Sequence, residues 1–164
     1  MESMTAFLHW LEKTPVATLV SQAQGVYSGL SMIHVGAAVI VFGMIVVVDL
    51  RLLGLASKGC SVTDLCREAL PWTWTAFIIS AITGGLLFTG QAVKYFANYA
   101  FQAKVALMAL AGINMLVFQF MTIRSVSQWN RGPRTPVAAK LAGAISLTCW
   151  IAVVAYGRWT AFVM

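Results

Sequence analysis

Four long apolar runs dominate the pattern of hydrophobic and polar positions along the chain. They cover about residues 26–48, 72–95, 104–123 and 137–159. A helix needs about 20 mostly apolar residues to cross about 30 Å of hydrocarbon, and each run is long enough. The runs lack the alternating polarity of membrane β-barrel strands. Because backbone amides in lipid must be paired within their own segment, the runs predict four transmembrane helices.

Two shorter segments, at about 5–24 and 61–70, have narrow apolar faces and many polar positions. Thr14–Pro15 predicts a new helix start in the first segment, and Ser61 with Asp64 resembles a capping box at the start of the second. Such amphipathic helices lie on a membrane surface rather than crossing it. The prediction is an all-α integral membrane four-helix bundle with short interfacial amphipathic helices.

Proline and glycine mark the ends of the runs. Pro71 directly precedes the second run and suits a first helical turn, where its missing amide costs nothing. Residues 131–136, with the sequence RGPRTP, predict a turn between the third and fourth helices. We find no internal repeat and no linker, so residues 1–164 are predicted to form a single transmembrane domain.

Composition supports a membrane protein and argues against a soluble enzyme. Hydrophobic residues make up 60% of the chain and charged residues only 10%, whereas a soluble domain carries about 25% charged residues. The mean hydropathy of +0.82 agrees. The net charge of +6 comes from scattered basic residues at the ends of the runs rather than from a basic stripe, so nucleic-acid binding is not expected.

The distribution of basic residues predicts the orientation. The loops after the first and third helices carry seven of them: Arg51, Lys58, Arg67, Arg124, Arg131, Arg134 and Lys140. The opposite side carries four: Lys13, Lys94, Lys104 and Arg158. Because basic residues concentrate on the cytoplasmic side, both termini are predicted to lie outside, in the periplasm for a bacterial inner membrane.

Small residues predict close helix packing. Gly29, Gly36 and Gly43 repeat every seven residues on the first helix, and Ser80 with Gly84 forms a similar pair on the second. Membrane helices associate through such small residues, because lipid provides no hydrophobic driving force between them. The pattern predicts a tight bundle that can continue into a homo-oligomer or a larger membrane complex.

His34 is the most informative polar residue within the runs, about eight residues from the start of the first helix. Strongly polar groups at membrane depth are costly and are functional hypotheses by default. The imidazole can hydrogen-bond to a neighbouring helix, ligate haem iron or copper, relay a proton or contact a quinone. The residues alone leave these alternatives open.

A haem or metal at His34 would need further ligands. The other histidine, His9, lies outside the runs, so a second ligand would be His9 folded back, the His34 of a second copy, or a methionine. Met108, Met115 and Cys149 are predicted to lie at a similar depth, and such soft ligands suit copper. The expected metal ligands are therefore His34, Met108, Met115 and Cys149.

Three further polar residues complete the expected site. Asn114 and Gln119 are predicted to hydrogen-bond across helices, and Arg158 is predicted to reach a lipid phosphate or a haem propionate. Asp49 and Arg51 are predicted to form a structural anchor, paired with each other or with Arg124. No phosphate-binding loop and no nucleophile beside a base is present in the sequence, so no catalytic residues are assigned.

The motifs resemble an uncharacterised bacterial four-helix inner-membrane family. They comprise His34 with Gly36 and Gly43, the run at 49–54 (DLRLLG), 70–74 (LPWTW), Thr83 with Gly84, 100–101 with Lys104, 111–112 with Asn114, and 157–159 (GRW). The resemblance covers most of the chain and implies the bundle. At greater distance the first helix resembles copper-resistance-D-type and cytochrome-b561-type membrane proteins, which implies haem or copper at membrane histidines. In the pattern of the uncharacterised family, a histidine stands at the position of Gln119.

The function expected from the sequence is binding of one haem b at His34, with electron transfer to or from a quinone or a periplasmic partner. Copper is the less favoured cofactor, and a chain without any cofactor is the third case. The alternatives are a non-redox accessory subunit of a membrane complex or homo-oligomer, and a small transporter or channel that uses Asn114, Gln119 and Gln91.

Overall fold

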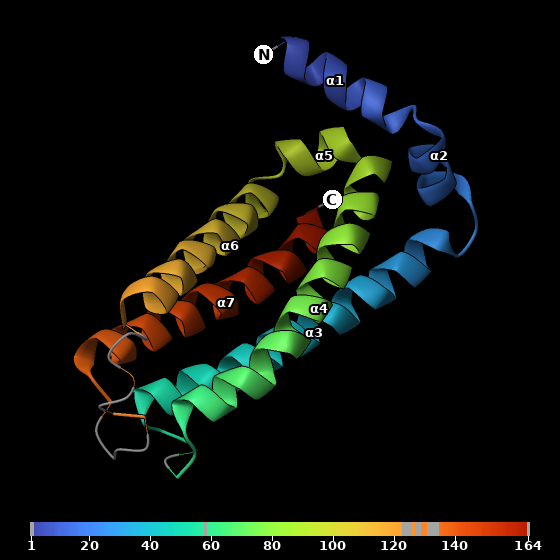
Figure 1. Ribbon diagram of the computed structural model, residues 1–164. Helices are drawn as coiled ribbons and strands as arrows, with labels where there is room; N and C mark the ends of the chain where they lie inside the picture. The colour runs from blue at the N-terminus through green and yellow to red at the C-terminus, as the bar shows by residue number, and fades with distance from the viewer. Residues whose placement is uncertain (1, 58, 123–125, 127–128, 131–134, 164) are drawn as a thin grey trace.

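The computed structural model describes residues 2–57, 59–122, 126, 129–130 and 135–163, and these are helical with no strand among them (Figure 1). The elements are α1 (Glu2–Glu12), α2 (Pro15–Gln22), α3 (Val26–Leu53), α4 (Val62–Gly90), α5 (Ala92–Ala97), α6 (Tyr99–Val117), the π-helical turn η1 (Phe118–Thr122) and α7 (Val137–Val163). The predicted all-α class is confirmed.

Four of these helices are long and apolar enough to cross a membrane: α3, α4, α7, and α6 continued through η1 to Met121. Each exceeds the roughly 20 residues that a bilayer requires. Most of their large side chains lie on the outside of the bundle, as expected where lipid is the solvent. The four predicted membrane helices therefore correspond to four helices of the structure.

The bundle has two distinct ends. In Figure 1, α1, α2, α5 and the end of α7 gather at the termini end, and the α3–α4 connection and the start of α7 lie at the opposite end, which we call the Arg51 end. Helix α3 packs along α4 and α7, and α6 packs along α7. The α3–α4 pair and the α6–α7 pair meet mainly where α3 packs along α7. Buried groups can therefore lie between the two pairs.

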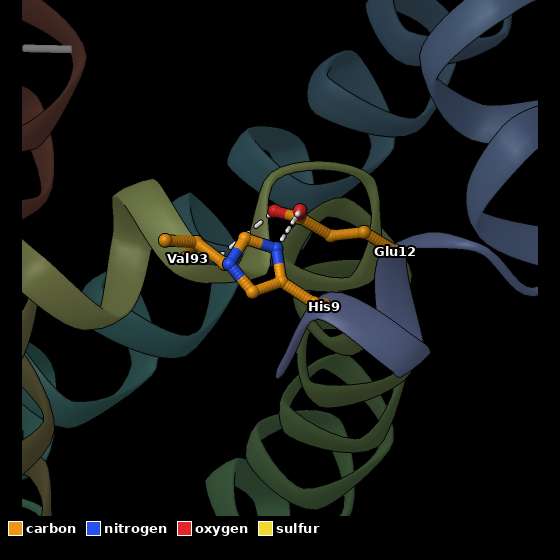
Figure 2. A network of polar contacts seen from close by, with 3 residues as sticks. All are labelled: His9, Glu12 and Val93. Carbon is orange, nitrogen blue, oxygen red and sulfur yellow. Dashed lines mark hydrogen bonds and ion pairs between the residues drawn. The ribbon is translucent and has the colours of Figure 1, made fainter. Parts of the chain in front are cut away.

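The two short N-terminal helices lie across the termini end rather than through the bundle (Figure 1). Helix α2 begins at Pro15, and the Ala17 amide donates to the Thr14 hydroxyl at its N-cap, as the sequence predicted. Glu12 fastens α1 to α5, because the Val93 amide donates to Glu12 Oε1 at 3.0 Å (Figure 2). His9 Nδ1 lies 3.9 Å from Glu12 Oε2 in the same network.

Helix α4 is longer than predicted, and the interfacial segment 61–70 is not a separate helix. The N-cap of α4 is Ser61, as expected, but the helix then continues through Pro71 to Gly90. The prediction that Pro71 occupies a first helical turn is wrong. Pro71 has no amide to donate to the Arg67 carbonyl, which weakens the helix there, and Figure 1 shows α4 bending along its length.

The second and third helices also differ from the predicted bounds at the termini end. The run to residue 95 is broken at Gln91, whose backbone φ of −150° and ψ of 48° ends α4 before α5. Asn98 then caps α6, accepting from the amides of Ala100 and Phe101, so α6 begins five residues earlier than predicted. The predicted end at 123–124 and most of the predicted turn at 131–136 lie outside the described residues.

The glycine stripe of α3 does not face the bundle, contrary to the predicted packing role. A Cβ atom placed on Gly29, Gly36 or Gly43 would meet nothing within 4 Å. The close approach occurs elsewhere, where α7 meets α3: a Cβ on Gly143 would lie 3.1 Å from Leu52 Cβ and 3.2 Å from the Asp49 carbonyl oxygen. Gly143 therefore sets the distance between α3 and α7.

Arg51 holds the connections together at its end of the bundle. The side chain is only 2% exposed. Its Nε donates to the Cys60 carbonyl at 2.9 Å, Nη2 donates to the Asn130 carbonyl at 3.2 Å, and Nη1 reaches the Thr135 hydroxyl at 3.5 Å. The predicted anchor role is therefore right, but the partners are loop carbonyls and a hydroxyl rather than Asp49. Arg124 lies outside the described residues.

The first prediction concerns the α3–α7 contact. Gly143→Ala should lower the free energy of unfolding by about 1–3 kcal/mol, because the new methyl group meets backbone atoms that cannot move aside. Unfolding in mixed dodecyl sulfate and maltoside micelles measures this change. Gly36→Ala is the matched control, because its Cβ has open space. Equal stability of the two variants would contradict the packing role of Gly143.

The second prediction concerns the Arg51 anchor. Arg51→Met should lower the unfolding free energy by at least about 2 kcal/mol, since hydrogen bonds to charged groups contribute about 1.5–3 kcal/mol each. The same micellar unfolding assay measures the loss. Arg67→Met on the exposed face of α4 is the control and should change stability little. A small, equal effect of both substitutions would contradict the anchor.

Candidate functional site

His34 lies in the half of the bundle nearer the termini end, between α3 and α4. Its Nδ1 lies 2.8 Å from the Ser80 carbonyl oxygen and 3.3 Å from the hydroxyls of Ser80 and Thr83. A carbonyl oxygen can only accept, so Nδ1 carries the proton and donates it to Ser80. The other ring nitrogen, Nε2, is then the unprotonated one and has a lone pair to offer.

A glycine makes room for this imidazole. A Cβ on Gly84 would lie 2.8 Å from His34 Cε1 and 3.1 Å from Nδ1, closer than side chains approach. The Ser80–Gly84 pair was predicted to allow close helix approach, and here it seats a histidine ring. The half-buried ring is therefore held from one side by backbone and hydroxyl groups of α4.

Lys104 of α6 lies within electrostatic range of His34. Its side chain crosses α7 at Gly157, where an added Cβ would lie 3.8 Å from Nζ. The sole ion pair among the described residues joins His9 and Glu12, so Lys104 has no carboxylate partner there. The sequence predicted Lys104 at the start of the third membrane helix. In the structure α6 begins five residues earlier, at Tyr99, so Lys104 lies inside the helix.

Two tyrosines join α3 to α5 nearer the termini end. The hydroxyls of Tyr27 and Tyr95 lie 3.1 Å apart, and the Tyr95 ring lies at a tilt against the rings of Phe88 and Phe101. Burial, together with the hydrogen bond to Tyr27, raises the pKa of the Tyr95 phenol. Tyr95 therefore stays neutral at physiological pH. Tyr27 precedes His34 by two helical turns on the same face of α3.

A separate cavity of about 180 Å³ lies in the half of the bundle nearer the Arg51 end. Residues of α3, α4, α6, η1 and α7 line it, and most are apolar or aromatic. The aromatic and sulfur-bearing members are Met44, Cys66, Trp74, Phe77, Met108, Met115, Phe118 and Trp150. Its polar members are Asp49, Thr73, Asn114, Gln119 and Ser146. Ligand pockets typically combine an apolar lining with a few polar groups in this way.

Asp49 supplies the one acidic group of this lining. The residue is 4% exposed, and its Oδ2 is buried without a hydrogen-bond partner. Ser146 on α7 hydrogen-bonds to the carboxyl group. Arg51, two residues further along α3, is occupied by the loop carbonyls. A residue that lines the cavity thus has a buried carboxyl oxygen that the described residues leave unsatisfied.

Irregular helix geometry surrounds the same cavity. Thr73 and Trp74 follow Pro71 on α4, and Phe118 and Gln119 belong to the π-helical turn after α6. π-helical turns occur frequently at functional sites. At membrane depth, irregular backbone is tolerated where it is buried in protein or lines a cavity. Both departures from regular α-helix fall at the cavity, which marks it as the candidate functional site.

The predicted site residues fall into separate places. Met108, Met115, Asn114 and Gln119 line the cavity, but His34 is not among its lining residues. Asn114 also donates to the Ala142 carbonyl at 2.9 Å, in line with its expected role across helices.

The other two predicted residues lie apart from both places. The thiol-bearing Cys149 is buried on α7 beside Ala144, Ile145 and Thr148. Arg158 is exposed, and its guanidinium stacks 4.7 Å from the ring centre of Phe162. The structure therefore does not gather the expected metal ligands, and no group of three or more His, Cys, Asp or Glu residues suited to a metal occurs within the described ranges.

The structure places the ligands expected for a haem apart from one another. The His34 ring packs against Gly84, and Met108 and Met115 line a cavity of which His34 is not a lining residue. His34 also lies about 140° around the α3 axis from Gly29, at about 100° per residue, and so points away from the open glycine stripe.

These features define a class: a helix-bundle protein of the multi-pass membrane type, with two separate polar sites between its helices. The chain belongs to DUF6644, a family of unknown function that it matches over residues 7–163. No curated protein and no solved structure matches it. Family membership confirms the resemblance to an uncharacterised family and carries no activity with it. The bacterial origin and the more distant resemblance to copper-resistance-D-type and cytochrome-b561-type proteins stay predictions.

The third prediction concerns the tautomer of His34. In ¹⁵N-histidine-labelled protein at neutral pH, His34 should carry its proton on Nδ1, because Ser80 accepts from that atom. Side-chain ¹⁵N shifts measured in nanodiscs distinguish the two ring nitrogens, with the exposed His9 as internal reference. Gly84→Ala should shift the His34 signals by displacing the ring. A proton on Nε2 of His34 in the unaltered protein would contradict the assignment.

Proposed function

We propose that this protein is a small membrane carrier that binds a small, largely apolar molecule in the cavity beside Asp49. The observation that carries the proposal is the coincidence of three features at one place: the cavity of about 180 Å³, an unsatisfied buried carboxyl oxygen, and two irregular helix segments. Transporters bind their substrates at discontinuous membrane helices, where freed backbone groups and polar side chains meet.

The size of the cavity limits the ligand. An apolar cavity of about 150 Å³ in a soluble protein admits benzene, so about 180 Å³ suits one aromatic ring with a short substituent. The cavity is partly open, which allows part of a longer molecule to extend beyond it. The transporter alternative from the sequence named Asn114 and Gln119, and both line this cavity.

Haem b binding, quinone contact and electron transfer stay predictions from the sequence and are not part of this proposal. His34 with a free Nε2 is the feature that favours them. The visible absorption spectrum of the purified protein, compared with that of His34→Ala, is the direct measurement. Association into a homo-oligomer or a larger complex likewise stays a prediction.

We also propose that the Arg51 end faces the cytoplasm of a bacterial inner membrane, with both termini in the periplasm. Seven of the eleven basic residues belong to the loops and helix ends on that side. This excess follows the rule that cytoplasmic loops are rich in lysine and arginine. The cavity would then lie nearer the cytoplasmic face, and His34 and Lys104 nearer the outside.

The fourth prediction tests the carrier site. Gly112 lines the cavity, and a Cβ placed on it would meet nothing within 4 Å, so Gly112→Leu can fill the space without a backbone clash. The neutral probe 2-(4-fluorophenyl)ethanol should give a saturable bound ¹⁹F NMR signal with the unaltered protein in maltoside micelles. Gly112→Leu should abolish that signal.

Gly36→Leu, which adds the same side chain on the outer face of α3, is the matched control and should retain the bound signal. Micelles without protein give the signal of probe dissolved in detergent. A probe signal that is absent from the unaltered protein, or that persists in Gly112→Leu, would overturn the cavity as the binding site.

A further inference from the structure

We infer that the ligand of the cavity is a lipophilic amine in its cationic form, bound through Asp49. This inference deepens the carrier proposal and rests on it. Its starting point is a buried carboxyl group with one oxygen left unsatisfied in a largely apolar wall. A buried charge is strongly unfavourable unless it is paired and hydrogen-bonded, so the cavity is incomplete without a group that can donate to Asp49.

Neither Arg51 nor Lys104, the two basic side chains of the described residues that are not exposed, supplies that partner. Arg51 is committed to the carbonyls of Cys60 and Asn130. Lys104 lies against Gly157, whereas Asp49 lies against Gly143 on the same helix. Those two glycines are about 21 Å apart at about 1.5 Å per residue, well beyond the reach of a lysine side chain. We therefore assign the donor to the ligand.

The rest of the lining favours an organic cation over a metal ion. Calcium takes about six to eight oxygen ligands, and magnesium requires an octahedron of them. Here Asp49 is the one carboxylate of the lining, and most of the other lining residues are apolar, aromatic or sulfur-bearing. Trp74, Phe77 and Trp150 present rings that attract an ammonium group through their π faces and that pack against an aromatic ring.

The lining therefore predicts a ligand with one cationic part and one apolar part. The ammonium group donates to the Asp49 carboxyl group, which also has a hydrogen bond with Ser146. The apolar part fills the space between α4, α6 and α7. At about 180 Å³ the cavity takes one ring and a two-carbon arm, so an arylalkyl amine is the expected class.

The fifth prediction compares two probes that differ only in the polar group: 2-(4-fluorophenyl)ethylamine and 2-(4-fluorophenyl)ethanol. At neutral pH the amine is a cation and the alcohol is not. In maltoside micelles, which contain no amine, the amine should bind the unaltered protein at least tenfold more tightly by ¹⁹F NMR titration. Asp49→Asn should reduce amine binding to the level of the alcohol and leave alcohol binding unchanged.

His34→Ala is the matched control, because it removes another titratable side chain of α3 without touching the cavity lining, and it should keep the preference for the amine. Equal binding of both probes to the unaltered protein, each lost in Gly112→Leu, would overturn the amine assignment and leave the carrier proposal standing. Absence of binding for both probes would overturn both. The comparison on the unaltered protein does not depend on whether Asp49→Asn folds.

Discussion

Arg51 and Asp49 lie two residues apart on α3, and their side chains lead to different parts of the structure. The Arg51 guanidinium needs several acceptors, because it is 2% exposed and far from water. It finds them in the Cys60 and Asn130 carbonyls, which belong to the connections that follow α3 and precede α7. Those connections must therefore converge on one point before the charge is satisfied, and this condition fixes how α3, α4 and α7 meet.

Once these helices meet there, the cavity follows from their side chains. Gly143 lets α7 approach the Asp49 carbonyl oxygen to about van der Waals contact. Asp49 is then enclosed between α3 and α7, and the small residues Ala111 and Gly112 leave space on the α6 side. Because Arg51 is fully used by loop carbonyls, the carboxyl group beside it is left without a cation. The anchor and the unsatisfied carboxyl group are thus two consequences of one arrangement.

The sequence predicted the four membrane helices well, because twenty apolar residues in a row have few other solutions. It also predicted the Ser61 and Thr14 caps, which depend on local spacing alone. It missed the continuity of α4 through Pro71, because a proline inside a helix and a proline at a helix start look alike in sequence. It missed the orientation of the α3 glycines, because a seven-residue repeat marks one face of a helix without saying what that face meets.

The candidate site was harder to predict, because spacing along a helix does not say what a side chain meets. The residues expected around His34 were chosen by depth, and depth does not say which way a side chain points. Met108, Met115, Asn114 and Gln119 do share a site, with Asp49 rather than with His34. Asp49 was assigned to an anchor together with Arg51, whereas only Arg51 has that role. Charge pairing inferred from neighbouring positions therefore failed where two residues on one helix faced different partners.

The separation of the two polar sites has a consequence for how the protein can work. His34 and Asp49 both lie on α3, fifteen residues and so about 22 Å apart along the helix axis. Each is joined to a different neighbour: His34 to α4 through Ser80, and Asp49 to α7 through Ser146. Because both sites lie on α3, a movement of that helix would act on both, and the proposed carrier could couple them in this way.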